Sequence, residues 1–173
     1  FNTIRQPIEK IKIKNVLFIC THNSARSIIA EAILNKIGKN KFVAFSAGSS
    51  PKSMVNPNTI KFLKSQGYET DYLRSKNWNE FAHLNSPKIE FIFTVCHSAA
   101  KEACPIWPGH SISTNWGVED PSSIGGTEKE VMNAYLNCYE ILKNKIVRFV
   151  NLRLEEFDQT RLKNKLIEIN KID

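Results

Sequence analysis

The apolar run Val16-Leu17-Phe18-Ile19-Cys20, followed by Thr21-His22-Asn23-Ser24-Ala25-Arg26-Ser27, decides the fold. The first of these segments predicts a buried strand at residues 15–20, because it is short, apolar and bounded by polar residues. From Ser24 onward the apolar residues recur at helical intervals, and Gly38 stands where that helix would end. The apolar face of the helix consists of Ile28, Ile29, Ala32, Ile33 and Ile37. A strand that passes through a short loop into a helix is the first unit of an α/β fold.

The same alternation continues along the chain. Further strands are predicted at residues 42–46, 89–96 and 112–116, and helices at residues 58–66, 77–84, 98–103 and 152–169. A long helix is expected after Thr127, because Thr127 and Glu130 have the spacing of a capping box. This pattern predicts a three-layer, flavodoxin-like α/β fold, with a four-stranded parallel sheet and helices on both faces. Ligands of such sheets bind at the carboxyl ends of the strands, where Cys20 and Cys96 are expected.

Length and composition predict one globular domain. The chain has 173 residues, which we expect to form a single domain over 1–173, and its 42% hydrophobic and 24% charged residues are ordinary for that class. No apolar run approaches the roughly 20 residues that span a bilayer, and residues 1–14 lack the apolar core of a signal peptide. We therefore expect a cytoplasmic protein with no membrane partner. Its four cysteines would then be kept reduced, so a cluster of them indicates catalysis rather than structural disulfides.

The net charge of +7 does not indicate a nucleic-acid partner. Most of the excess positive charge lies in residues 1–14 and 141–173, and the middle of the chain is nearly neutral. No zinc-finger spacing or RNA-binding motif accompanies the charge. The distribution therefore favours a solvated tail and a solvated helix face.

The segment that begins at Cys20 has the chemistry of an oxyanion site. Cys20 is followed by five residues and then by Arg26 and Ser27. Backbone amides at the start of a helix bind anions, and an arginine adds a charged, bidentate fork. The same field is expected to lower the pKa of Cys20, and Ser27 could donate a hydrogen bond to its thiolate. The candidate oxyanion-binding residues are Thr21, His22, Asn23, Ser24, Ala25 and Ser27, with Cys20 as a nucleophile at the floor of the loop.

At these residues the chain resembles the low-molecular-weight protein tyrosine phosphatase superfamily, and within it the thiol-dependent arsenate reductases. Three segments carry the resemblance, which covers most of residues 15–150 and leaves 151–173 as a helical C-terminal extension. They are residues 16–27 with Ala30-Glu31-Ala32, then Ser46-Ala47-Gly48 with Asn56-Pro57-Asn58, and Trp116-Gly117-Val118-Glu119-Asp120-Pro121 with Gly126-Thr127-Glu128. The resemblance implies that Cys20 is the nucleophile, Arg26 the oxyanion clamp and Asp120 the general acid.

The chain departs from the family pattern at two loop positions. His22 stands where the family usually has glycine, so a positive φ at that position would be strained. Ala25 stands where many relatives carry a second loop cysteine, which removes a thiol but no part of the oxyanion cradle.

The resemblance leaves two chemistries open. As a reductase, Cys20 would attack arsenate, Cys96 would release arsenite by forming a disulfide with Cys20, and Cys104 would move that disulfide outward. An external thiol (thioredoxin, or glutaredoxin with glutathione) would then reduce it, with no tightly bound cofactor and no metal. The alternative is a low-molecular-weight phosphatase that hydrolyses phosphate monoesters with Cys20, Arg26 and Asp120 alone. Against this alternative, Pro121 is followed by Ser122 and Ser123, whereas phosphatases of the family carry aromatic residues there.

Overall fold

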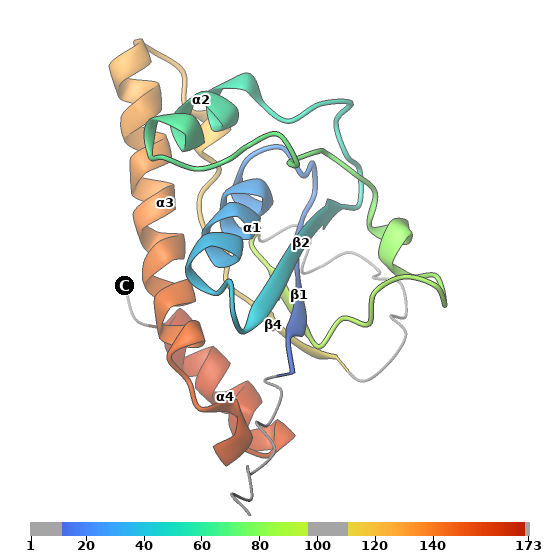
Figure 1. The fold of residues 1–173 in the computed structure, drawn as a ribbon. Coiled ribbons are helices and arrows are strands. Elements are labelled where there is room, and N and C mark those ends of the chain that lie inside the picture. The colour runs from blue at the N-terminus through green and yellow to red at the C-terminus, as the bar shows by residue number, and fades with distance from the viewer. Residues whose placement is uncertain (1–11, 97–110, 172–173) are drawn as a thin grey trace, which may run out of the picture.

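A computed structural model describes residues 12–96 and 111–171, and it contains the predicted four-stranded parallel sheet (Figure 1). The strands are β1 (Lys14–Cys20), β2 (Phe42–Gly48), β3 (Phe91–Thr94) and β4 (Ile112–Asn115), and their spatial order is β2-β1-β3-β4. Every neighbouring pair is parallel, with Ile19 opposite Ala47 on one side and opposite Thr94 on the other. The order reverses between β1 and β3, which is where open α/β sheets bind their ligands.

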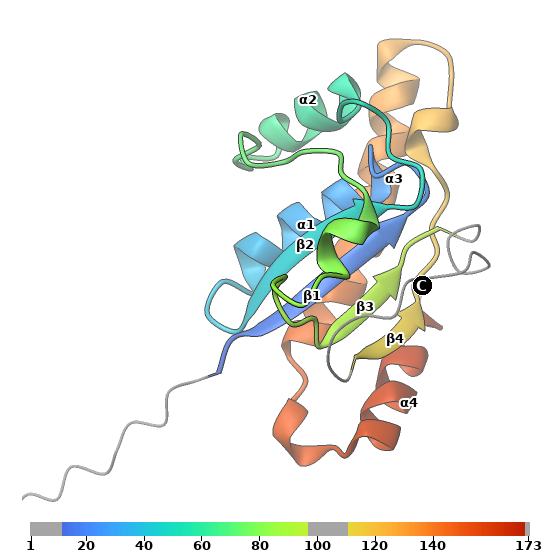
Figure 2. The ribbon, with the colours of Figure 1, turned by 90° about the vertical axis from the view of Figure 1, so that its right-hand side faces the viewer.

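The α-helices are α1 (Arg26–Ile37), α2 (Pro57–Ser65), α3 (Glu128–Val150) and α4 (Gln159–Asn170), and single 3-10 turns occur at η1 (Trp78–Phe81), η3 (Pro121–Ser123) and η4 (Leu154–Glu156). α1 and α3 lie together behind the sheet in Figure 2, and η1 lies in front of it. The long helix begins as predicted, because the hydroxyl of Thr127 accepts a hydrogen bond from the amide of Glu130. None of the helices in the described ranges is long and apolar enough to cross a membrane.

Two predicted helices differ from the structure, and one cannot be compared with it. Residues 77–84 form only the turn η1, whose contribution to the core is Trp78 and Phe81. Residues 152–169 are divided, because the Asp158 side chain caps a new helix by accepting from the amide of Arg161. The helix predicted at residues 98–103 lies outside the described part of the chain.

The core joins the sheet to the helices through stacked aromatic rings. Phe18 of β1 stacks on Phe93 of β3 with ring centroids 5.6 Å apart, and Phe93 stacks on Trp116 at 3.9 Å. Phe149 of α3 meets Phe93 edge-on at 5.2 Å, which places α3 over this face. The buried indole of Trp116 donates a hydrogen bond to the carbonyl of Leu166 at 3.0 Å, so α4 is fixed to the same core.

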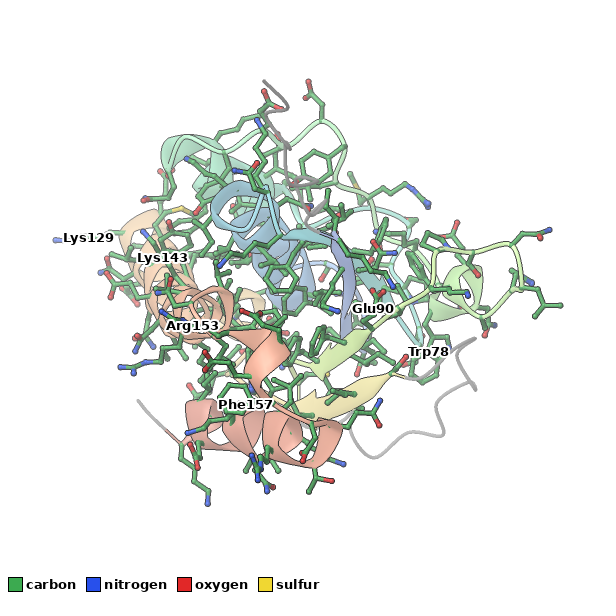
Figure 3. The ribbon with its side chains drawn as sticks, turned by 60° about the horizontal axis from the view of Figure 1, so that its bottom comes forward. Trp78, Glu90, Lys129, Lys143, Arg153 and Phe157 are labelled. Carbon is green, nitrogen blue, oxygen red and sulfur yellow. The ribbon has the colours of Figure 1, made fainter. Side chains whose placement is uncertain are left out.

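The amino-terminal ends of the strands, remote from Cys20, border a groove of about 850 Å³. Lys12, Lys14 and Lys41 line it, together with Arg153 and Phe157 from the connection between α3 and α4. Figure 3 looks at this end of the molecule and labels Arg153 and Phe157 there. Lys12 and Lys14 therefore border the same groove as Arg153, at the end of the sheet opposite Cys20.

Candidate active site

The candidate site is the loop at residues 20–27, which we call the oxyanion loop. It connects the carboxyl end of β1 to the first turn of α1 at the point where the strand order reverses. α1 has no side-chain cap at Ala25 and no acidic residue in its first turn. The first amides of a helix have no intrahelical partner and lie at the positive end of the helix dipole. The start of α1 is therefore suited to an anion from outside the chain.

Segments outside the oxyanion loop hold its carbonyl groups. The amide of Ser50 donates to the carbonyl of Thr21 at 2.8 Å, and the amide of Asn56 donates to the carbonyl of Ser24 at 3.1 Å. The hydroxyl of Thr59 also donates to the Ser24 carbonyl, at 2.9 Å. On the inner side, the amide of His22 lies near enough to the sulfur of Cys20 to favour the thiolate and so to lower the pKa of Cys20. The loop is thus fixed with carbonyls directed outward and at least one amide directed at the nucleophile position.

Asn23 carries the unusual backbone conformation of the loop. Its φ is 47°, and it is the one non-glycine residue with positive φ in the described ranges. The strain foreseen for His22 therefore falls one residue later, on a residue type that tolerates the left-handed region better. The Asn23 side chain accepts from the amide of Lys76 at 2.9 Å and donates to the hydroxyl of Ser27 at 2.8 Å. Because the Ser27 oxygen acts as acceptor there, its own proton remains available to a sulfur or an oxyanion.

Arg26 and Asp120 lie side by side at the loop. One terminal nitrogen of Arg26 is 3.6 Å from the Asp120 carboxylate, and the other donates to the carbonyl of Val118 at 3.2 Å. The Nε of Arg26 is buried and has no hydrogen-bond partner. A guanidinium with a buried and unused donor fits an oxyanion, which would accept from it. Asp120 is held by Ser122, whose amide and hydroxyl donate to one carboxylate oxygen at 2.9 and 2.7 Å.

The thiols of Cys20 and Cys96 lie close enough for each to affect the ionisation of the other. Both residues are buried free thiols, and the Thr21 hydroxyl lies 3.6 Å from the Cys96 sulfur. The pKa of Cys20 is raised, first by the interaction with Cys96 and then by burial, against the opposing effects of Arg26 and the His22 amide. The sequence prediction of a lowered pKa is therefore wrong for this arrangement. Two adjacent sulfurs cannot both ionise cheaply, so the pair tends to keep one proton between them.

The structure brings most of the predicted site residues together. Cys20, Arg26, Asp120, Cys96 and the loop residues 21–27 all lie at the carboxyl edge of β1 and β3. Cys104 lies outside the described residues. Cys138, predicted to be core, is buried in α3, and burial raises its pKa to about 12. Among the described residues, no three His, Cys, Asp or Glu side chains are grouped to hold a metal.

Sequence reasoning gave no role to two residues that contact the loop. A Cβ on Gly48 would lie 2.6 Å from the carbonyl oxygen of Thr21, so β2 approaches the loop more closely than a side chain allows. Lys76 supplies the amide that binds Asn23. Gly48 belongs to the Ser46-Ala47-Gly48 segment that carries the family resemblance, but nothing in the sequence indicated that it contacts the loop. No sequence pattern around Lys76 pointed to a role for that residue.

A cysteine and an arginine in a strand–loop–helix turn, with a carboxylate beside them on a parallel sheet, define a class of cysteine-dependent enzymes that bind tetrahedral oxyanions. The chain belongs to the low molecular weight phosphotyrosine protein phosphatase family, whose model matches residues 15–164.

Within this family, the chain is similar to arsenate reductases in sequence and in structure. The arsenate reductase of Oceanobacillus iheyensis is 32% identical over 136 residues, covering 79% of this chain and 94% of that protein. The structure of an arsenate reductase from Archaeoglobus fulgidus aligns with a TM-score of 0.57 and 28% identity, over 76% of this chain and 98% of the other. The low molecular weight protein tyrosine phosphatase of T. tengcongensis aligns with a TM-score of 0.60 over 90% of this chain and 98% of the other. At 21% identity, that last likeness concerns the fold alone.

Proposed function

We propose that this protein is an arsenate reductase that uses Cys20 as nucleophile and a second cysteine as the source of electrons. The observation that carries the proposal is that a second buried free thiol, Cys96, lies next to Cys20 at the oxyanion loop. A phosphatase needs one cysteine, because water completes its reaction. A reductase must supply two electrons, and a second thiol in contact with the first can supply them by forming a disulfide. The reductase names of the relatives in Oceanobacillus iheyensis and Archaeoglobus fulgidus support the same choice.

In the first step, the Cys20 thiolate attacks the arsenic of arsenate and displaces one oxygen. Arg26 and the loop amides bind the remaining oxygens, whose charge they neutralise. Asp120 donates a proton to the oxygen that leaves, which departs as water. The hydrogen bonds from Ser122 hold the Asp120 carboxyl 3.6 Å from Arg26 and so at the edge of the oxyanion position.

In the second step, the Cys96 sulfur attacks the Cys20 sulfur. A disulfide forms, the sulfur–arsenic bond breaks, and its electron pair stays on arsenic, which is reduced from the +5 to the +3 state. The proton lost by Cys96 passes to the departing arsenite. One arsenate and two thiols thus give one arsenite, one disulfide and one water. Cys104 would then attack Cys96, and an external thiol such as thioredoxin, or glutaredoxin with glutathione, would return the chain to its reduced form.

The surroundings of Asp120 suit a small inorganic oxyanion better than an aryl phosphate. Ser122 and Ser123 follow the Asp-Pro pair, and both hydroxyls are turned back to Asp120 at 2.7 Å. Small polar residues offer no flat apolar surface on which a phenol ring could stack. Phosphatase activity is therefore the second candidate, and it would require Cys20, Arg26 and Asp120 but neither Cys96 nor Cys104.

A single-turnover experiment separates these functions. Fully reduced protein is mixed with arsenate without external thiol, and arsenite and free thiols in denaturant are counted. We expect about one arsenite formed and about two thiols lost per chain. Cys96→Ser should form no arsenite, whereas Cys138→Ala, which alters a buried thiol that the proposed relay does not use, should behave as the parent chain does. No arsenite and no thiol loss, together with hydrolysis of a phosphate ester, would instead establish the phosphatase.

A further inference from the structure

A buried ion pair lies behind the oxyanion loop, and the proposed reaction does not use it. The ammonium of Lys76 is 3.8 Å from the carboxylate of Glu31, and each side chain is 6% exposed. Glu31 also accepts from the hydroxyl of Ser46, and the Lys76 ammonium donates to the carbonyl of Arg74 at 2.8 Å. Burial raises the pKa of Glu31 and lowers that of Lys76. Their mutual attraction opposes both shifts, because each charge stabilises the charged form of the other residue. Such pairs are costly to bury, so stability alone is a weak explanation for this one.

The backbone of Lys76 contacts the oxyanion loop directly. Its amide donates to the Asn23 side chain at 2.9 Å, and its carbonyl accepts from the amide of Gly48, also at 2.9 Å. The next residue, Asn77, forms an isolated parallel bridge with Gly48. One residue thus has its side chain fixed to α1 through Glu31 and its main chain fixed to the loop. A change in the position of Lys76 would therefore also move its backbone amide, which donates to Asn23.

We infer that Lys76 is a positioning residue, whose ion pair with Glu31 holds the oxyanion loop in its anion-binding conformation through Asn23. The inference rests on the proposed function only in taking residues 20–27 as the oxyanion site. A non-glycine residue with φ of 47° persists only where its surroundings determine it. Without a fixed amide at residue 76, Asn23 relaxes toward negative φ, and the loop amides no longer converge.

This mechanism predicts a specific kinetic signature. When only a fraction of molecules has the competent loop, the apparent dissociation constant of every oxyanion rises by the inverse of that fraction. A saturating anion still selects the competent loop, so turnover at saturation is largely preserved. A purely structural role for the pair would instead lower the melting temperature and leave anion affinity unchanged.

The test is calorimetric titration of inorganic phosphate into reduced protein, with arsenate kinetics alongside. For Lys76→Met we expect phosphate Kd and arsenate KM to rise together by roughly tenfold or more, with kcat within about twofold of the parent value. Lys61→Met is the matched control, because Lys61 pairs with Glu128 on the surface, where both side chains are more than half exposed. It should leave both constants unchanged. Unchanged phosphate affinity in a folded Lys76→Met protein would overturn the inference.

The double variant Glu31→Gln with Lys76→Met separates positioning from the loss of a positive charge. It removes both charges, so the net field at the loop is restored, and uncharged buried pairs are often tolerated in folding. If positioning is correct, phosphate affinity stays as weak as in Lys76→Met. Recovery of the parent affinity would refute positioning in favour of a charge effect. Because phosphate binding is measured without turnover, failure of arsenate reduction would count against the proposed function and not against this inference.

Discussion

Replacement of Gly48 by alanine tests whether close packing of β2 fixes the oxyanion loop. A Cβ at position 48 would lie 2.6 Å from the carbonyl oxygen of Thr21, and ordinary contact begins at 3.4 Å, so a shift of about 0.8 Å is needed. The same Cβ would lie 3.1 Å from both the amide nitrogen and the Cβ of Asn23, so a shift of residue 48 toward Asn23 would not relieve the clash. The atoms that must move are the backbone of the oxyanion loop itself. Catalytic sites tolerate displacements of about 0.5 Å, and an error of about 1 Å can cost roughly a hundredfold in rate.

We therefore expect Gly48→Ala to lower kcat/KM for arsenate about a hundredfold, with a loss of roughly 1–3 kcal/mol in stability from overpacking. Steady-state kinetics, phosphate titration and thermal unfolding measure the three effects. Gly125→Ala is the matched control, because a Cβ there meets nothing within 4 Å. If Gly48→Ala kept kcat/KM and phosphate affinity within about twofold of the parent, the loop would not depend on this contact and the reasoning would fail.

Three further substitutions test single contacts. Cys96→Ala removes the interaction that raises the pKa of Cys20 most, so the Cys20 thiolate should form at lower pH. The pH profile of Cys20 alkylation by iodoacetamide should therefore move to lower pH. A move to higher pH would contradict the role given to Cys96 in raising this pKa. Asp120→Asn keeps the shape of the side chain but removes the proton donor, so kcat should fall by about 10²–10⁴-fold while phosphate Kd changes little; a kcat within tenfold of the parent would argue against general acid catalysis by Asp120. Thr127→Ala removes the cap of α3 and should cost about 1 kcal/mol, or roughly 2–4 °C in melting temperature, with kinetics unchanged; equal melting temperatures would show that the cap contributes nothing.

The parts of the fold that the sequence predicts well are governed by short-range patterns. β1 and α1 follow from one apolar run and one helical face, and the cap of α3 follows from Thr127 and Glu130. The residues of the oxyanion loop are consecutive, so the sequence alone identifies them as one candidate site. Residues 77–84 show the limit of such patterns: their apolar spacing predicts a helix, but two anchors, Trp78 and Phe81, are buried by a single turn.

Other parts of the site depend on contacts between distant segments. The raised pKa of Cys20 arises from Cys96, which pairing of β1 with β3 brings alongside it. The positive φ falls on Asn23 rather than His22 because a partner for the Asn23 side chain comes from residue 76. The ion pair of Glu31 with Lys76 is equally invisible in the sequence, since neither residue has a neighbour that suggests a partner. Local pattern identifies the nucleophile, and the tertiary fold sets its ionisation.

The parallel pairing of β1 with β3 has a consequence for how the protein unfolds. Cys20 and Cys96 are about 76 residues apart in the chain, and the sheet places their thiols next to each other. A disulfide between them closes a large covalent ring that includes β2, α1 and α2. In the chain-entropy account such a ring disfavours the denatured ensemble by about 4.5 kcal/mol. Heat resistance would then follow the formation of this bond. In a Cys104→Ser chain, where the proposed relay stops at the Cys20–Cys96 disulfide, a calorimetric scan could report the extent of turnover without any measurement of arsenic.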